Sequence, residues 1–367
     1  MCPIGKYAKK IAACILALVF FYPAAPVLAE KLTIDVAEVH NTLHIKANLD
    51  RQTRSYEIAA QEMIAQKLKT IYYLLQPTEK DTGTLENTNR FLKHQFSALQ
   101  SFLKKADDSH QNQLNMPKET RALLEEVGGS IFNPIHSYMD AATEVEFVIA
   151  DKEIDFPLDA LFYQGRPLFL LKPVTYKIGK RTDGHFAVSK TWSGCMISDP
   201  TSAAGKAVKQ VKQYFPNSRY FNSQTIRFDD IKKLGTAKIL IISADGGPAG
   251  IELPHLAIRS WTLAALKPSL TYFNTAKLGL SLDFLKSFQQ VGTDYYVAPI
   301  FDYKSDDASA VTVERFFCAL SRGNSPSYAL YLTRKTIFDE CLQNDKDFKW
   351  LMLQAFPFRV YQQGARL

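Results

Sequence analysis

Small and polar residues end two short apolar runs of this chain, and their types could support hydrolysis or ligand binding. The first run, residues 237–244, holds four consecutive branched aliphatic residues, and the second covers residues 269–275. The candidate residues at the two ends are Asp245, Gly246, Gly247, Asn274, Thr275 and Ala276. A carboxylate can move a proton, and a threonine hydroxyl can attack a carbonyl when a neighbouring base activates it. These two ends therefore form the candidate site of the chain.

Both runs predict strands that are buried on both faces, because their apolar residues follow one another without alternation. Further strands are predicted at residues 144–150, 175–178, 194–198 and 293–300. Helices are predicted between and after the strands, at residues 203–215, 227–234, 281–291, 308–321 and 326–343. This alternation predicts an α/β fold with a mainly parallel sheet and helices on both faces. In such sheets ligands bind beyond the carboxyl ends of the strands, so the two candidate ends should share one edge.

The first 29 residues have the pattern of an export signal. Lys6, Lys9 and Lys10 precede an apolar stretch at residues 11–21, and small residues lead up to Ala29. This pattern resembles a secretory signal peptide, and the apolar stretch is short for a membrane span. We expect an exported protein, periplasmic or secreted, with no membrane span after cleavage. An uncleaved N-terminal anchor is the alternative.

Residues 30–115 are predicted to form an N-terminal region that precedes a larger domain at residues 116–367. Alternating polar and apolar residues at 31–48 predict a β-hairpin. Apolar stripes at helical spacing predict a helical hairpin made of residues 55–76 and 84–105. The sequence leaves open whether this helical hairpin covers the candidate site.

Charge and motifs exclude several classes of function. The chain of 367 residues has a formal net charge of +7, which becomes +4 when the signal segment takes away three lysines and no acidic residue. No dense stripe of lysine and arginine predicts nucleic-acid binding. The sequence has no phosphate loop, dinucleotide fingerprint or nucleophile elbow, and His40 and His44 lie in a predicted hairpin, where a zinc site is not expected. We therefore expect neither a cofactor nor a metal.

Six further segments occur in a characteristic order. They are residues 146–161 with a Pro-Leu-Asp-Ala-Leu ending, residues 175–178, residues 195–200 with an Asp-Pro ending, residues 284–292 with a glycine at their end, residues 293–302, and residues 316–330. Together they resemble the CHAT domain, a caspase-like relative of the cysteine peptidases in the clan that includes separase. The resemblance covers about residues 125–345. It implies a caspase-like, mainly parallel sheet, preceded here by the β-hairpin and the helical hairpin.

The resemblance also indicates where a catalytic dyad would lie. Active CHAT domains carry a histidine and a glycine after the strand that here ends in Asp245 and Gly246. They carry a cysteine after the next strand, where this chain has Ala276. An alanine offers no nucleophile, and a carboxylate is a poor substitute for an imidazole in protonating a leaving amine. The resemblance therefore implies a catalytically inactive relative of the peptidases, without catalytic residues.

The leading prediction is an exported scaffold or binding module with a protein or peptide partner. The residues expected to line its cleft are Gly246, Gly247, Asn274, Thr275 and Asp302. Two other functions stay open. Thr275 or Cys195 could act as a relocated nucleophile, although alternation along the strand predicts that Thr275 faces away from Asp245. The glycine-rich loop after Asp245 could instead bind a small ligand, with His255 as the nearest histidine in sequence.

Overall fold

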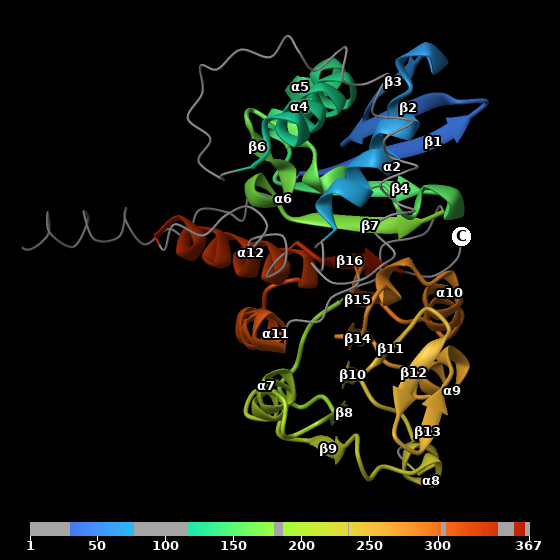
Figure 1. Cartoon of the computed structure of the whole chain (residues 1–367), viewed down its shortest axis with the longest axis vertical. Helices are drawn as coiled ribbons and strands as arrows, with labels where there is room; N and C mark the ends of the chain where they lie inside the picture. Colours follow the sequence, from blue (N-terminus) through green and yellow to red (C-terminus); the bar gives the residue numbers. More distant parts are fainter. Residues whose placement is uncertain are drawn as a thin grey trace, which may run out of the picture.

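One sheet of eleven strands runs through the described part of the chain (Figure 1). The computed structural model describes residues 30–76, 116–179, 186–233, 235–301, 306–343 and 356–363. The strand order is β3-β2-β1-β4-β7-β16-β15-β14-β10-β8-β9. These strands are β1 (Lys31–Val39), β2 (Thr42–Leu49), β3 (Gln52–Ile58), β4 (Glu144–Ile149), β7 (Val174–Ile178), β8 (Gly194–Ser198), β9 (Ser218–Asn222), β10 (Ile239–Ser243), β14 (Leu270–Phe273), β15 (Tyr295–Pro299) and β16 (Phe358–Gln362).

Helices and two short pieces of sheet complete the described part. The helices are α2 (Ile64–Leu75), α4 (Lys118–Phe132), α5 (His136–Ala141), α6 (Leu168–Leu171), α7 (Ala203–Val211), α8 (Phe228–Lys232), α9 (Ser260–Ala264), α10 (Leu282–Gln290), α11 (Asp306–Ser321) and α12 (Pro326–Gln343). A small sheet pairs β5 (Phe162–Tyr163) with β6 (Arg166–Pro167). Among the described residues, no helix combines the length and the apolar character needed to cross a membrane.

The half of the sheet from β9 to β15 is parallel and covered on both faces. Ile239 and Ile241 of β10 belong to one apolar cluster with residues of α7 and α11, such as Phe316. Leu240 and Ile242 belong to the other cluster, with residues of α10 such as Phe284. Because both faces are covered, consecutive residues are apolar, which is why these strands could be predicted. The predicted α/β fold, with a mainly parallel sheet and helices on both faces, is confirmed.

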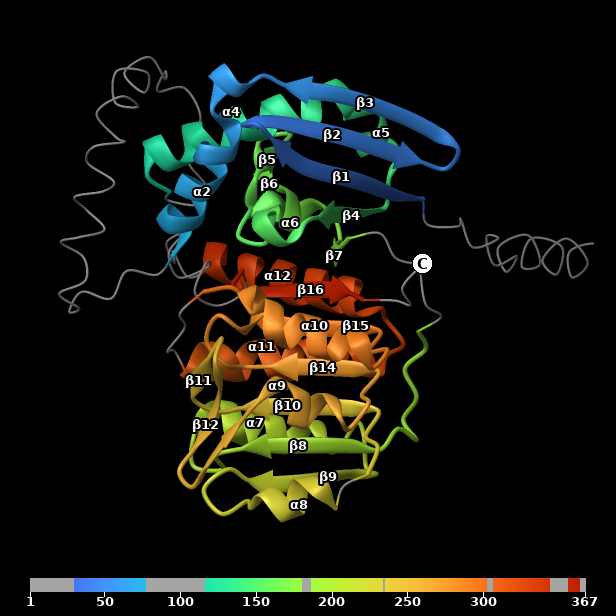
Figure 2. The ribbon, with the colours of Figure 1, turned by 90° about the vertical axis from the view of Figure 1, so that its right-hand side faces the viewer.

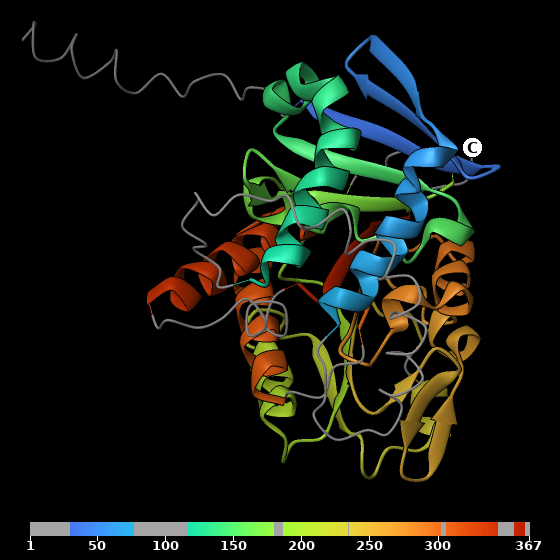
Figure 3. The same cartoon turned by 45° about the horizontal axis from the view of Figure 1, so that its top comes forward.

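The N-terminal half of the sheet is an antiparallel ribbon joined to β4. β1 pairs with β2 and β2 with β3, both antiparallel, and β1 runs parallel to β4 from Lys31 beside Glu144 to Val36 beside Ile149. The predicted hairpin is present, and the pairing of β1 with β4 makes it part of the main sheet. Inward residues such as Ile34 and Ile45 pack in the cluster of α2 and α4, which lie side by side across this half (Figure 3).

The helix predicted over residues 55–76 is wrong in its first part. Ser55 to Ile58 complete β3, and the helix begins only at Ile64. Ile58 fits the apolar stripe at helical spacing in residues 55–76, but it is buried as the last inward residue of a strand. Met63 fits the same stripe and is nevertheless 44% exposed. The second predicted helix, residues 84–105, lies outside the described residues.

Strand β16 joins the two halves of the sheet, and the sequence did not predict it. It pairs antiparallel with β15 and parallel with β7, where Tyr361 lies beside Tyr176. Arg359 is 1% exposed, and its guanidinium lies 4.0 Å from the centre of the Tyr176 ring. Two of its nitrogens donate hydrogen bonds to the carbonyl oxygens of Ile154 and Phe156. Arginine is usually exposed, so its presence in a sequence indicates a surface segment. For this reason residues 358–362 do not show the apolar pattern of a buried strand.

Candidate functional site

The ends of β10 and β14 lie next to each other, as predicted. They lie on the side of the sheet where the parallel strands have their carboxyl ends, and we call this side the edge. The two strands are parallel neighbours, with Ile239 beside Leu270 and Ile242 beside Phe273. In Figure 2 the arrows of β14 and β8, which flank β10, point to the side where β11 begins. Asp245 and Ala276, which follow the two strands, are therefore brought to the same edge by the topology.

Hydrogen bonds fasten the end of β14 to the end of β10. The backbone N–H of Asn274 donates to the carbonyl oxygen of Ile242 at 2.7 Å, which continues the ladder by one residue. The side-chain amide of Asn274 donates to Ser243 Oγ at 2.9 Å. The hydroxyl of Thr275 donates to the carbonyl oxygen of Ala244 at 2.8 Å. Side chains from one loop thus satisfy backbone and hydroxyl groups of the other, and the edge is held in one arrangement.

Asp245 and the glycines after it lead into a small three-stranded sheet of β11 (Gly246–Gly247), β12 (Gly250–Leu253) and β13 (Leu256–Ile258). Asp245 is exposed. Gly246 has a φ of 139°, and a Cβ there would lie 2.5 Å from the carbonyl oxygen of Gly250, so only glycine fits. A Cβ on Gly247 would lie 4.0 Å from the carbonyl oxygen of Ala276. The predicted glycine-rich loop is therefore a paired strand that faces the loop after β14.

The loop after β14 is also fastened on its other side. The backbone N–H of Lys277 donates to the carbonyl oxygen of Phe301, just beyond β15. The hydroxyl of Tyr72, on helix α2, donates to the carbonyl oxygen of Ile300 at 2.8 Å, and its ring lies 5.4 Å from that of Phe301. The N-terminal region therefore reaches the edge of the sheet that carries the candidate site. Asp302, predicted to line the cleft, lies outside the described residues.

Neither predicted alternative nucleophile is placed to react. Thr275 is 2% exposed, and its hydroxyl hydrogen is used in the bond to Ala244. Cys195 lies inside β8 and is fully buried, and this burial raises the pKa of its thiol to about 12. A thiol with such a pKa is neutral near pH 7, whereas the thiolate is the attacking form. The geometry therefore disfavours hydrolysis by either residue.

The described histidines lie in turns, at the exposed start of helix α5 and at one cross-strand pair. His255 is exposed in the turn between β12 and β13. His44 Nδ1 lies 3.0 Å from Glu57 Oε1 across the open face of β2 and β3. Within the described ranges, no cluster of three or more His, Cys, Asp or Glu side chains has an arrangement that could hold a metal ion.

One charged residue of this edge, Asp199, was not predicted from the sequence. Asp199 comes directly after Ser198 at the end of β8, and Asp245 comes two residues after Ser243, which pairs with Ser198 at the end of β10. The backbone N–H and hydroxyl of Thr201 donate to Asp199 Oδ1 at 2.8 Å and 2.7 Å. These bonds hold the pKa of the Asp199 carboxyl below its usual value. The edge therefore carries two carboxylates on adjacent strands. The Asp-Pro ending of residues 195–200 was the available signal, since it ends a predicted neighbouring strand.

Comparisons by sequence find no relative. No protein-family model matches the chain. No curated protein matches it either. The resemblance to CHAT domains therefore depends on the sequence segments alone.

Comparison by structure finds distant neighbours. One is the crystal structure of the Arg-specific cysteine proteinase gingipain R (RgpB), with a TM-score of 0.42 and 11% identity over 69% of each chain. Another is the complex of the pro- and mature domains of RgpB from Porphyromonas gingivalis, with a TM-score of 0.43 and 9% identity, covering 66% of this chain and 68% of that one. The eleven-stranded, mainly parallel sheet with helices is consistent with a caspase-like fold. Nothing about activity follows from a likeness at this distance.

Proposed function

We propose that this chain is an exported, catalytically inactive member of the caspase-like proteins of the CHAT type, and that it binds a peptide or protein partner at the edge formed by β8, β10 and β14. One observation carries the proposal. Asp245 and Ala276 follow parallel neighbouring strands, at the positions where the resemblance expects histidine and cysteine. A methyl group and a carboxylate at these positions cannot form a thiolate–imidazole pair.

The fastening of the loops supports binding. Asn274 donates a side-chain hydrogen bond to the last residue of β10, and Thr275 and Ser281 each donate one to the loop after β10, Ser281 to the carbonyl oxygen of Pro248 at 3.0 Å. A preorganised surface loses less conformational freedom when a ligand binds. Loops that are held together in this way, although the expected dyad is replaced, fit a role in binding a chain without cutting it.

The charge of the edge favours a basic partner. Asp245 is exposed, and Asp199 keeps a lowered pKa, so the Asp199 carboxyl stays ionised at and below neutral pH. Two carboxylates on adjacent strands attract lysine or arginine side chains and raise the rate of encounter at low salt. We therefore propose that the partner presents a basic segment.

Selection from a peptide library tests the site. We expect the purified protein to enrich peptides with basic residues. Ala276→Phe should weaken their binding by about tenfold or more, because it adds a large ring in the loop after β14, at the proposed binding site. The matched control is Ala37→Phe, the same change at a half-buried alanine on β1. Equal binding by both variants would place the partner elsewhere, and failure of the wild-type protein to enrich any peptide would overturn the proposal.

The charge preference has its own variant. Asp245→Asn removes one carboxylate and keeps the shape, so binding of a basic peptide should weaken several-fold at low salt and less at high salt. Asp50→Asn makes the same change in the turn between β2 and β3 and should leave binding unaltered. Isothermal titration at two salt concentrations measures both. A salt-independent affinity that is identical in the two variants would reject the basic partner.

A further inference from the structure

Strand β3 is one of the two edge strands of the main sheet, and we call the open side of each edge strand a margin. It has seven residues and pairs only with β2 in the strand order. Figure 2 shows it at the outer margin of the ribbon, with no labelled element beyond it. Among the described residues, none donates a backbone hydrogen bond to its outer side. An unpaired strand edge presents a row of N–H and C=O groups that can pair with another chain.

The opposite margin of the sheet is protected in ways that β3 is not. Strand β9 has five residues and closely follows Pro216. A short edge strand and a nearby proline are among the means by which proteins limit edge pairing. Strand β3 has seven residues, and residues 52–58 contain no proline. The two margins of one sheet therefore differ in how open they are to a further strand.

The turn into β3 determines which of its backbone groups face outward. Asp50 and Arg51 form a two-residue turn, so Leu49 and Gln52 are the closing pair and turn their backbone groups toward each other. In an antiparallel pair, successive residues of a strand direct their backbone N–H and C=O groups alternately toward the partner strand and away from it. The N–H and C=O groups of Thr53, Ser55 and Glu57 are therefore directed away from β2.

We propose that two copies of this chain associate through antiparallel pairing of their β3 strands, about a two-fold axis that passes between the two Ser55 residues. This inference is independent of the function proposed for the β10 and β14 edge. In this register Arg54 of each copy lies opposite Tyr56 of the other, and Thr53 lies opposite Glu57. An arginine over a tyrosine ring gains a cation–π contact, and a threonine can donate to a carboxylate.

Side-chain charge selects this register over its neighbours. A shift of one copy by two residues in one direction places Arg54 opposite Arg54, and like charges directly opposite are destabilising. The shift in the other direction places Arg54 opposite Ile58, which is 5% exposed and packs in the core. The register centred on Ser55 avoids both conflicts and puts a small side chain at the axis.

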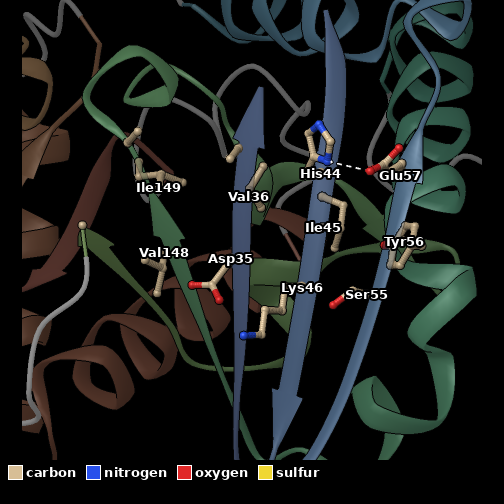
Figure 4. Close-up of a pocket in the computed structure, with 13 residues that line it drawn as sticks. Asp35, Val36, His44, Ile45, Lys46, Ser55, Tyr56, Glu57, Val148 and Ile149 are labelled. Atoms are coloured by element: carbon tan, nitrogen blue, oxygen red, sulfur yellow. Dashed lines mark ion pairs between the residues drawn. The ribbon is translucent and has the colours of Figure 1, made fainter. Parts of the chain in front are cut away.

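A cavity on the open face of the ribbon lies beside the same margin (Figure 4). Its volume is about 540 Å³, and β3 contributes Ser55, Tyr56 and Glu57 to its lining. Figure 4 shows Glu57 turned toward His44 and Ser55 on the outermost strand of the cavity. The pairing about Ser55 would bring the cavities of two copies together into one groove across the axis.

Disulfide trapping tests the register. In Ser55→Cys, the two new thiols lie on directly opposed residues, whose Cα atoms are about 5.5 Å apart, within disulfide reach. We expect a covalent dimer on a non-reducing gel after mild oxidation. Thr53→Cys is the matched control, because residue 53 lies opposite residue 57 and the two thiols are offset by four residues, about 13 Å. Equal cross-linking of both variants, or of neither, would overturn the proposed register.

Sedimentation of the untreated protein tests the association itself. We expect a mass of two chains for the wild-type protein and of one chain for Ser55→Pro, because proline removes the outward N–H at the axis. Proline is tolerated on an edge strand where the N–H faces solvent, so circular dichroism should show a folded protein. A single chain at every concentration of the wild-type protein, or a dimer that persists in folded Ser55→Pro, would contradict the proposal.

Discussion

The two halves of the sheet differ in how many of their faces are covered. In β10 every residue is buried, whereas in β1 buried and half-exposed residues alternate from Lys31 to Ala37. Strands covered on both faces show no side chain to solvent, so any recognition by that half must use the loops beyond the strand ends. Strands covered on one face show every second side chain along their whole length. The half from β9 to β15 can therefore bind a partner only through the loops beyond its strand ends. The N-terminal half can bind one through its open face and through its unpaired edge strand β3.

The junction between the halves depends on β16. It is the only described strand that pairs with both β7 and β15, and Arg359 ties it to residues 154–156 of the N-terminal half. Tyr361 reaches in the other direction, where its hydroxyl donates to the carbonyl oxygen of Gly279 at 2.5 Å. Two differently built halves thus share one strand, and the comparison can be tested first at that strand.

The largest effect is expected from Arg359→Met. Methionine keeps much of the volume but removes the two hydrogen bonds that the charged guanidinium donates to the carbonyl oxygens of Ile154 and Phe156, each worth about 1.5–3 kcal/mol. We expect the free energy of unfolding to fall by about 3–6 kcal/mol in denaturant titrations. Arg219→Met, at an exposed arginine of β9, is the control and should change stability by less than about 0.5 kcal/mol. An unchanged midpoint for Arg359→Met would show that this contact does not join the halves.

Consecutive alanine substitutions sharpen the comparison between the halves. In β10, Leu240→Ala and Ile241→Ala should each cost about 2–5 kcal/mol, because both side chains are fully buried on opposite faces. In β2, Ile45→Ala should cost a similar amount, whereas Lys46→Ala on the open face should cost less than about 0.5 kcal/mol. Unfolding free energies of the four variants measure the pattern. A large cost for Lys46→Ala would mean that the open face is covered in solution.

A smaller effect is expected from the thiol of Cys195 at high pH. Burial raises its pKa to about 12, above the ordinary 9.0. Below pH 9 both folded and unfolded chains keep the proton. Between pH 9 and 12 the unfolded chain releases it while the folded chain keeps it, so this contribution to stability falls as pH rises. From pH 9 to 10 the wild-type protein should lose about 1 kcal/mol more than Cys195→Ala. Parallel pH profiles for the two proteins would mean that the thiol is accessible.

The sequence predicted the doubly covered strands better than the open ones. Strands such as β8 and β10 appear as unbroken apolar runs, and their positions were predicted closely. Strand β3 was missed because most of its residues are exposed, so it carries no buried stripe of its own, and Ile58 coincided with the helical spacing that follows. Strand β16 was missed because Arg359 interrupts its apolar character.

At the candidate site, the sequence indicated the place but not the contacts. The carboxyl ends of two predicted neighbouring strands were enough to bring Asp245 and Ala276 together, because parallel strands end at a common edge. The bond from Asn274 to Ser243 depends on the register of β10 against β14, and the place of Asp199 depends on β8 lying next to β10. Neither the register nor the neighbour of a strand can be predicted from a single sequence.

Intact-mass measurement after incubation with active-site probes tests the proposed loss of catalysis most directly. A fluorophosphonate probe reports an activated hydroxyl, and a reactive-thiol probe reports an activated cysteine. We expect no stoichiometric label at Thr275 or Cys195 of the native protein, because the Thr275 hydroxyl donates its hydrogen bond to the carbonyl oxygen of Ala244 and the Cys195 thiol is buried. One label per chain, located by peptide mapping at Thr275 or Cys195, would contradict the proposal and make the protein an enzyme.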